Sequence, residues 1–265
     1  MTDRYAVIGN PIEHSKSPQI HAAFARQTGQ DMEYGKVLAP LEGFAATVEA
    51  LRAQGYRGCN VTVPFKLEAF ALAAERSARA QDAGAVNTLS FDGGRLSGDN
   101  TDGAGLVADI TRNHATPIAG ARVLLLGAGG AARGVIRPLL DAGPAGLTLA
   151  NRSLDKALAL QRHFGDLEIC DFAGLSRQQF DVVINATSAG LSDAALPVPA
   201  TVFAPGGLAY DMMYGRRTPF MQLAGEAGAR VADGLGMLVE QAAEAFYLWR
   251  GIRPDTAPVI RQLRA

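Results

Sequence analysis

Short apolar runs alternate with segments of helical periodicity over the first hundred residues of the chain. The apolar runs predict strands at residues 5–8, 32–38 and 58–63. The segments between and after them predict helices that begin at Pro18 and end at Gly29, and that cover residues 41–54 and 68–74. Residues 86–91 and 96–98 flank Asp92-Gly93-Gly94, which predicts a hairpin at the edge of a mixed sheet.

The pattern changes after Asp102. A helix over residues 103–113 leads to the uniformly apolar run 123–126, which is typical of a parallel strand buried on both faces. Further strands are predicted at residues 147–150, 167–170, 181–185, 208–211 and 230–233, and a last long helix at 237–250. This alternation predicts a doubly wound α/β sheet, so the chain is expected to form two α/β units that divide near residue 102.

Composition narrows the class of protein. Of the 265 residues 48% are apolar and 19% charged, and the net charge is −1, so disorder is excluded and nucleic acid and membrane surfaces are poor partners. Cys59 and Cys170 stand alone in apolar runs, which predicts two buried, reduced thiols and no metal site. The charged N-terminus and the absence of about 18 consecutive apolar residues predict a soluble, cytoplasmic protein.

Residues 122–142 contain a glycine loop in the setting of a dinucleotide site. A buried strand runs into Gly127-Ala128-Gly129-Gly130, and a helix begins near Ala131. Gly127 permits the tight turn, Gly129 lets the backbone approach a pyrophosphate, and the helix N-terminus attracts the anion. The alternative is a tight strand-to-helix turn without a ligand.

The strand that follows predicts which dinucleotide is bound. NAD sites carry a carboxylate at the end of this strand for the ribose 2′-hydroxyl, whereas here Asn151-Arg152-Ser153 follow, with Lys156 nearby. A guanidinium and an ammonium suit a 2′-phosphate, so NADP is favoured over NAD. The alternative is that Arg152 is a solvated surface charge.

Two residues in the first part of the chain are candidates for proton transfer. Lys66 is one of four lysines and directly follows NVTVPF, where partial desolvation would ease proton exchange near neutral pH. The alternative is a solvated lysine at the start of a helix, and Asp102 is open to a similar alternative. Asp102 lies in GDNTDG, which lacks the spacing of a calcium loop. The four histidines have neither metal nor relay spacing, and surface or packing roles are expected for them.

Several segments together resemble the shikimate dehydrogenase family. They are GNPIEHSKSP at 9–18, NVTVPFK at 60–66, GAVNTL at 84–89, GDNTDG at 98–103, GAGGAAR at 127–133, NATSAG at 185–190, DMMYG at 211–215 and DGLGMLVEQAAEAF at 233–246. The resemblance covers nearly the whole chain in the expected order. It implies two α/β domains with a cleft between them: a substrate domain with a mostly parallel mixed sheet (residues 1–101 and 237–265), and a Rossmann-like NADP-binding domain (102–236).

The resemblance also implies roles for individual residues. Lys66 and Asp102 would be the catalytic pair, and Ser15 and Ser17 would clamp the substrate carboxylate. Asn60, Thr62, Asn87 and Gln241 would bind ring hydroxyls, with Tyr214 also on the substrate side. The cofactor residues would be Gly127, Ala128, Gly129, Gly130, Ala131, Asn151, Arg152, Ser153, Lys156, Thr187, Met213, Gly234 and Met237.

The chemistry of these residue types suits ketone reduction, which needs a hydride donor, a proton donor at the oxygen and a substrate held in register. We therefore expect an NADP-dependent oxidoreductase that interconverts 3-dehydroshikimate and shikimate, a step of chorismate and aromatic amino acid biosynthesis. A quinate/shikimate dehydrogenase and a non-catalytic NADP(H)-binding regulator are the alternatives. Oligomeric state is left open, with a homodimer as one option.

Overall fold

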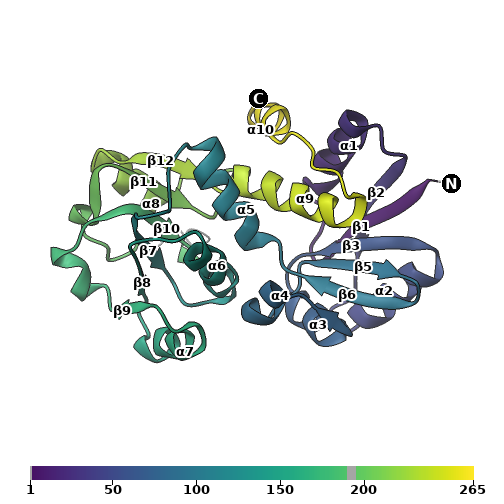
Figure 1. The fold of residues 1–265 in the computed structure, drawn as a ribbon, viewed down its shortest axis with the longest axis horizontal. Coiled ribbons are helices and arrows are strands. Elements are labelled where there is room, and N and C mark those ends of the chain that lie inside the picture. Colours follow the sequence, from purple (N-terminus) through teal and green to yellow (C-terminus); the bar gives the residue numbers. More distant parts are fainter. Residues whose placement is uncertain (1, 190–194) are drawn as a thin grey trace. The chain divides into compact units, whose positions relative to one another are not determined.

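The computed structural model describes residues 2–189 and 195–265. The chain forms two compact units, Met1–Gly105 with Val239–Ala265, and Leu106–Leu238. Each unit contains one six-stranded sheet covered by helices (Figure 1). Among the described residues, no helix combines the length and apolar character required to cross a bilayer.

The sheet of the first unit is mixed, with the strand order β2-β1-β3-β5-β6-β4. Its strands are β1 (Asp3–Gly9), β2 (Met32–Leu38), β3 (Tyr56–Val61), β4 (Glu75–Arg76), β5 (Thr88–Asp92) and β6 (Arg95–Asp99). β2, β1 and β3 are parallel, β5 is antiparallel to both β3 and β6, and β4 is parallel to β6. The predicted βαβαβ unit and hairpin are therefore present in one sheet.

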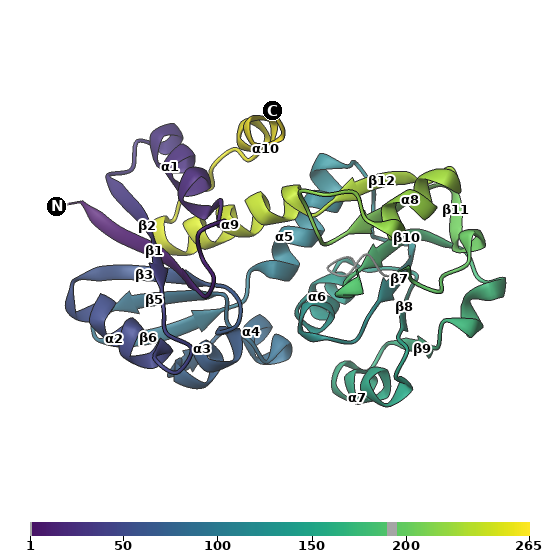
Figure 2. The ribbon, with the colours of Figure 1, turned by 180° about the vertical axis from the view of Figure 1, so that it is seen from behind.

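Helices cover both faces of this sheet. The helices of the first unit are α1 (Ser17–Thr28), α2 (Phe44–Ala53), α3 (Lys66–Leu72), α4 (Ala78–Ala83) and α10 (Ala257–Arg264), together with part of α5 (Asp102–Ala108) and of α9 (Leu235–Arg250). α2 and α3 pack on one face, through Phe44 and Phe65, and α1 and α9 lie on the other, as both views show (Figures 1 and 2). The alternation of side chains along β1 explains this, because Ile8 points to the first face and Tyr5 stacks on Trp249 at the second.

Several expectations for this unit were wrong in detail. The second helix begins at Phe44 instead of residue 41. The third strand ends at Val61 instead of residue 63, because Phe65 N donates to Thr62 O (3.0 Å) and forms a turn there. The hairpin does not form the sheet edge, since β4 pairs with β6 beyond it. β4 and α4 were not predicted, because a strand of two residues and a helix of six are too short to show a periodic pattern.

The second unit is a doubly wound parallel sheet, as predicted, with the order β12-β11-β10-β7-β8-β9. Its strands are β7 (Arg122–Leu126), β8 (Gly146–Ala150), β9 (Glu168–Cys170), β10 (Phe180–Asn185), β11 (Phe203–Asp211) and β12 (Arg230–Asp233), and its helices include α6 (Gly130–Asp141), α7 (Leu154–Phe164) and α8 (Pro219–Glu226). α6 and α7 pack on the face that carries Val123 and Leu125, and α8 on the face that carries Leu124 and Leu126.

Two further expectations are corrected by this unit. The predicted helix 103–113 is α-helical only to Ala108 and continues as one π-helical turn over Asp109–Asn113. Cys170 is half-buried at the end of β9, whereas Cys59 is fully buried, and both thiols are free.

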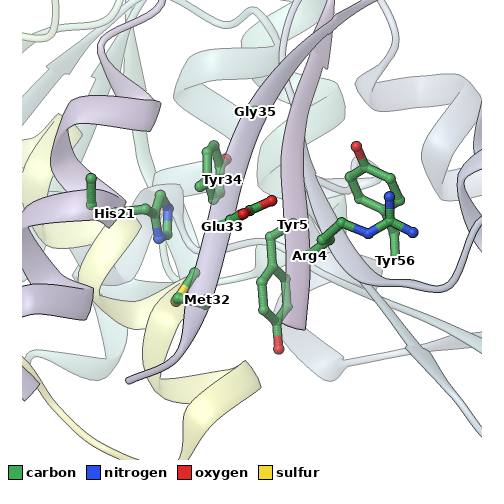
Figure 3. A pocket seen from close by; sticks show the side chains of 9 residues that line it. Arg4, Tyr5, His21, Met32, Glu33, Tyr34, Gly35 and Tyr56 are labelled. Carbon is green, nitrogen blue, oxygen red and sulfur yellow. The ribbon is translucent and has the colours of Figure 1, made fainter. Parts of the chain in front are cut away.

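His21 belongs to an aromatic cluster between α1, α9 and the sheet of the first unit. Its ring stacks on Tyr34 with centroids 4.1 Å apart (Figure 3) and lies 5.6 Å from Trp249. The side chain is 0% exposed and neither ring nitrogen has a hydrogen-bond partner in the described structure. Burial lowers the pKa of His21 from 6.5 to about 3, and the nearby Asn60 amide opposes this only in part. His21 is thus a neutral packing residue.

We predict that His21 makes folding sensitive to acid. The unfolded chain protonates His21 near pH 6.5 and the folded chain only near pH 3, so the stability contributed by the neutral ring is lost as the pH falls through this window. The slope for one proton is roughly 1.4 kcal/mol per pH unit. His21→Phe should remove that slope, measured by urea unfolding between pH 7 and pH 4. An unchanged pH dependence would contradict the assignment.

Gly105 of α5 lies against α9 within the first unit. A Cβ at this position would lie 2.7 Å from Gln241 N and 2.9 Å from Gln241 Cα. These are main-chain atoms of a packed helix, so they cannot move without shifting the whole helix. The two helices therefore approach this closely only because residue 105 has no side chain.

Gly105→Ala should destabilise the protein although alanine favours helices by about 1 kcal/mol. Overpacking costs about 1–3 kcal/mol, so the melting temperature is expected to fall. Gly225→Ala in α8 is the matched control, because its nearest neighbouring atoms lie at 3.6 and 3.9 Å. Equal melting temperatures for the two variants would argue against the close approach. Differential scanning calorimetry provides the measurement.

Candidate active site

One edge of the sheet in the first unit gathers most of the predicted substrate residues. β1, β3 and β6 end at this edge and β5 begins there, as their pairing requires. Asn60 lies near the end of β3, Asn87 directly precedes β5, and Lys66 and Asp102 are the first residues of α3 and α5. The topology thus brings residues from distant parts of the chain to one place.

Lys66 and Asp102 form an ion pair at this edge. Lys66 Nζ donates to Asp102 Oδ2 at 2.6 Å, and the two side chains are 31% and 19% exposed. The other carboxylate oxygen, Oδ1, accepts from Asn87 Nδ2 at 2.8 Å. Asp102 N also donates to Asn100 Oδ1. Both oxygens of the carboxylate are therefore held, while the ammonium stays partly open to solvent.

Asn87 is the centre of the surrounding hydrogen bonds and is only 2% exposed. Its Nδ2 also donates to Thr101 Oγ1 (2.9 Å) and to Gln241 Oε1 (3.4 Å), while its Oδ1 accepts from Thr101 N (2.9 Å). Asn60 Nδ2 donates to Asn87 O at 3.2 Å. The structure thus connects three of the predicted hydroxyl-binding residues, Asn60, Asn87 and Gln241.

The other predicted substrate residues are less tightly connected. Ser15 Oγ accepts from Ser17 N at 3.3 Å, at the start of α1, and Ser17 is buried whereas Ser15 is half-buried. Thr62 is half-buried after β3, where its N donates to Ile8 O (2.9 Å). Tyr214 belongs to the second unit, and burial raises the pKa of its hydroxyl.

Sequence reasoning missed three residues of the cluster. Thr101 and Thr88 bridge the amides, and the Tyr34 hydroxyl donates to Asn60 Oδ1 at 2.7 Å. Thr101 and Thr88 stand inside GDNTDG and GAVNTL, so their segments were recognised without their roles. Nothing in the pattern around Tyr34 indicates that it reaches a residue two strands away.

The carboxyl edge of the second sheet brings together the predicted cofactor residues. β7 pairs with β8 so that Leu126 opposes Ala150, which places Gly127 and Asn151 side by side. Gly127 has a φ of 105°, and a Cβ there would lie 3.0 Å from Thr187 Cγ2. Glycine is therefore needed both for the turn and for the contact. Gly129, Gly130 and Ala131 are exposed beyond it, and Ala128 is half-buried.

The N-terminus of α6 has the features of an anion site. Gly129 is the N-cap, and within the described chain no side chain caps this twelve-residue helix, so its first N–H groups face outward with the positive end of the helix dipole. Arg152, Ser153 and Lys156 are exposed after β8, and Asn151 Nδ2 donates to Ser153 O. A pyrophosphate and a 2′-phosphate both fit this set of donors and charges.

The remaining predicted cofactor residues follow the neighbouring strands. Thr187 Oγ1 donates to Asn185 Oδ1 (2.8 Å), Met213 N to Asp211 Oδ1 (3.0 Å), and Gly234 N to Met213 O (2.9 Å). Asp211 is fully buried and orders these turns, a role that the sequence did not reveal. Met237 is 8% exposed within the core of the unit. Gly190, the last residue of NATSAG, lies outside the described residues.

A separate pocket of about 460 Å³ opens in the first unit (Figure 3). Its lining includes Arg4, His21, Glu33, Tyr34 and Tyr56. None of the predicted substrate residues lines it, but Tyr34 belongs both to this lining and to the cluster around Lys66.

Family models match most of the chain. Residues 7–89 match a model described as "Shikimate dehydrogenase substrate binding domain". Residues 109–192 match "Shikimate / quinate 5-dehydrogenase", and residues 234–264 match "Shikimate 5'-dehydrogenase C-terminal domain". The matched ranges include Lys66, Asn87 and the glycine turn at Gly127, whereas Asp102 and Met213 lie between them.

Individual relatives match over almost their full length. A shikimate dehydrogenase (NADP(+)) of Methylobacillus flagellatus is 64% identical, over 99% of this chain and 99% of the relative. The crystal structure of an Ael1 enzyme from Pseudomonas putida is 53% identical, with a TM-score of 0.95 over 99% and 98% of the two chains. Shikimate 5-dehydrogenase from Thermus thermophilus, solved with NADP(H) and shikimate, is 36% identical, with a TM-score of 0.89 over 99% of each chain.

Proposed function

The chain belongs to the shikimate dehydrogenase family, and on that premise we propose that it catalyses the reversible NADPH-dependent reduction of 3-dehydroshikimate to shikimate. We assign residues 1–101 with 237–265 to the substrate domain and residues 102–236 to the NADP-binding domain. The compact units divide a few residues later, so Asp102 lies in the first unit and Met237 in the second. The NADP(H) and shikimate bound to the Thermus relative support both ligand assignments. The reaction is a step of aromatic amino acid biosynthesis.

The observation that carries this proposal is the 2.6 Å contact between Lys66 Nζ and Asp102 Oδ2. The ammonium holds a transferable proton, and the carboxylate fixes the direction in which it points. Because Asn87 occupies the second carboxylate oxygen, Asp102 cannot rotate away from Lys66 without losing a hydrogen bond. This is the arrangement that general acid–base catalysis requires.

In the direction of reduction, Lys66 Nζ donates its proton to the ketone oxygen. In the reverse direction, the same nitrogen takes the proton from the substrate hydroxyl while Asp102 holds it in position. Asn60, Thr62, Asn87 and Gln241 bind the ring hydroxyls, and Ser15 and Ser17 bind the carboxylate, so that the reacting carbon is held in register. Tyr214 is a further substrate residue.

NADPH, when bound, supplies the hydride to the carbonyl carbon. Gly127–Ala131 would hold its pyrophosphate against the N-terminus of α6, with Thr187, Met213, Gly234 and Met237 on the neighbouring turns. Asn151, Arg152, Ser153 and Lys156 would hold the adenosine ribose and its 2′-phosphate. The exposed positive charges after β8 support NADP over NAD.

Two alternatives are tested in one assay. A quinate/shikimate dehydrogenase would oxidise quinate as well as shikimate, and an NADP(H)-binding regulator would oxidise neither. NADPH absorbance should fall when 3-dehydroshikimate is added. Shikimate should reduce NADP⁺ but not appreciably NAD⁺, and quinate should not appreciably reduce NADP⁺. Activity with quinate equal to that with shikimate would favour the first alternative, and no turnover the second.

Location and assembly extend this proposal. We place the protein in the cytoplasm, where the free thiols of Cys59 and Cys170 are compatible with a reducing environment. A homodimer is one possible oligomeric state, and analytical ultracentrifugation of the purified chain would determine which state forms.

Lys66→Ala should lower kcat by at least about 100-fold, the usual contribution of a general acid–base group, with a smaller change in KM. Steady-state oxidation of shikimate is the measurement. Lys36→Ala is the control, because Lys36 is exposed and its Nζ binds only the main-chain oxygen of Glu13 among the interactions described. A kcat within a few-fold of the wild type for Lys66→Ala would remove Lys66 from the mechanism.

Arg152→Ala should weaken NADP⁺ by roughly 10- to 150-fold and leave NAD⁺ nearly unchanged, since a charge-assisted contact to the 2′-phosphate is lost. Lys156 lies near enough along α7 to compensate in part. Adding Asn151→Asp should favour NAD⁺, because a carboxylate repels the phosphate. Arg162→Ala, at the other end of α7, is the control. Equal losses for both cofactors in kcat/KM would contradict this interpretation.

A further inference from the structure

The Tyr34 hydroxyl reaches the substrate cluster from β2. Tyr34 opposes Tyr5 in the neighbouring strand, and Asn60 opposes Val7, so all four residues lie on one face of the sheet. The Tyr34 side chain crosses β1 and donates to Asn60 Oδ1 at 2.7 Å. Tyr34 thus holds one of the proposed substrate residues, Asn60, from the far side of β1.

Two features keep this hydroxyl in place as a donor. Burial raises the pKa of Tyr34 well above 10, so the oxygen keeps its proton at any working pH. The ring is stacked on His21 at an interplanar angle of 5° (Figure 3), which restricts its movement. Asn60 Oδ1 therefore always faces a hydrogen-bond donor.

Thr88 connects the two asparagine amides on the same face of the sheet. It opposes Asn60 directly in the β3–β5 ladder and is 1% exposed. Its Oγ1 accepts from Asn60 Nδ2 at 3.0 Å and donates to Asn87 Oδ1 at 2.8 Å. A hydroxyl suits this position because it is both acceptor and donor.

These contacts form a chain in which every donor points the same way. Tyr34 donates to Asn60, Asn60 to Thr88, Thr88 to Asn87, and Asn87 to the Asp102 carboxylate. A flip of the Asn87 amide would set its Oδ1 against the Asp102 carboxylate and its Nδ2 against Thr101 N. A flip of the Asn60 amide would set its Oδ1 against the main-chain oxygen of Asn87, so both amides keep one orientation. The chain ends at the carboxylate that holds Lys66 Nζ.

We propose that Tyr34 and Thr88 are positioning residues for shikimate oxidation, which set the orientation of the Asn60 and Asn87 amides and, through Asn87, of the Lys66–Asp102 pair. This inference rests on the function proposed above. Tyr34 acts on substrate binding, because Asn60 is its partner, and Thr88 acts on turnover, because Asn87 holds the catalytic carboxylate. Neither side chain needs to touch the substrate.

Four variants test the inference by shikimate oxidation with NADP⁺ and by thermal unfolding. Thr88→Val should lower kcat about 10-fold with KM for NADP⁺ unchanged, and Thr88→Ser, which keeps the hydroxyl, should restore most of it. Tyr34→Phe should raise KM for shikimate by about 5- to 10-fold with little change in kcat. Tyr5→Phe is the matched control, because Tyr5 opposes Tyr34 in register and its hydroxyl contacts Arg250, outside the chain of amides.

The kinetic constants, rather than the melting temperatures, decide the outcome. Variants that shift the melting temperature but keep wild-type kcat and KM would show that both hydroxyls are only structural and would overturn the inference. If Thr88→Val does not fold, Tyr34→Phe and Thr88→Ser still test the inference. A wild-type KM for shikimate in Tyr34→Phe would overturn it. A wild-type enzyme that does not oxidise shikimate would instead overturn the proposed function, and this inference with it.

Discussion

The contact between the Lys66 ammonium and the Asp102 carboxylate is the interaction on which the arrangement of the first unit's site depends. Because both groups are partly exposed, water screens their attraction, and the pair contributes little to the stability of the fold. Its consequence is geometric. The carboxylate fixes where the ammonium proton points, and Asn87 fixes the carboxylate. A group that exchanges a proton with the substrate needs a fixed orientation of its N–H bonds more than it needs a strong ion pair.

The fold fixes this orientation by bringing Lys66, Asp102 and Asn87 to one edge of the first sheet. Lys66 and Asp102 are the first residues of two helices that begin after β3 and β6, and the antiparallel β5 brings Asn87 to the same edge. A purely parallel sheet would have placed the start of β5 at the opposite edge. The mixed topology of the first sheet is therefore a requirement of the site. The second sheet is wholly parallel, and its carboxyl edge instead combines a glycine turn with the start of α6.

Buried polar groups in the first unit extend the order of the site into the core. The Tyr34 hydroxyl and the Thr88 hydroxyl are held by packing and sheet register, and their hydrogen bonds orient amides that are themselves buried. Such groups are costly unless each is satisfied. His21 differs, because neither of its ring nitrogens has a hydrogen-bond partner in the part of the chain that the structure describes, and burial keeps the ring neutral against Tyr34. The core thus stabilises the position of polar atoms as well as burying apolar area.

The sequence alone determined the alternation of strands and helices, the glycine turn at Gly127 and the positive charges after β8, because each depends on neighbouring residues and local periodicity. The resemblance of NVTVPFK and GDNTDG to the family's motifs implied Lys66 and Asp102 as a pair, although 35 residues stand between them. Only the tertiary structure decided that β4 closes the sheet, that Gly105 lies against Gln241, and that Tyr34 reaches Asn60 across β1. These contacts join residues far apart in the chain, and their reach depends on strand order and register, which no local pattern encodes.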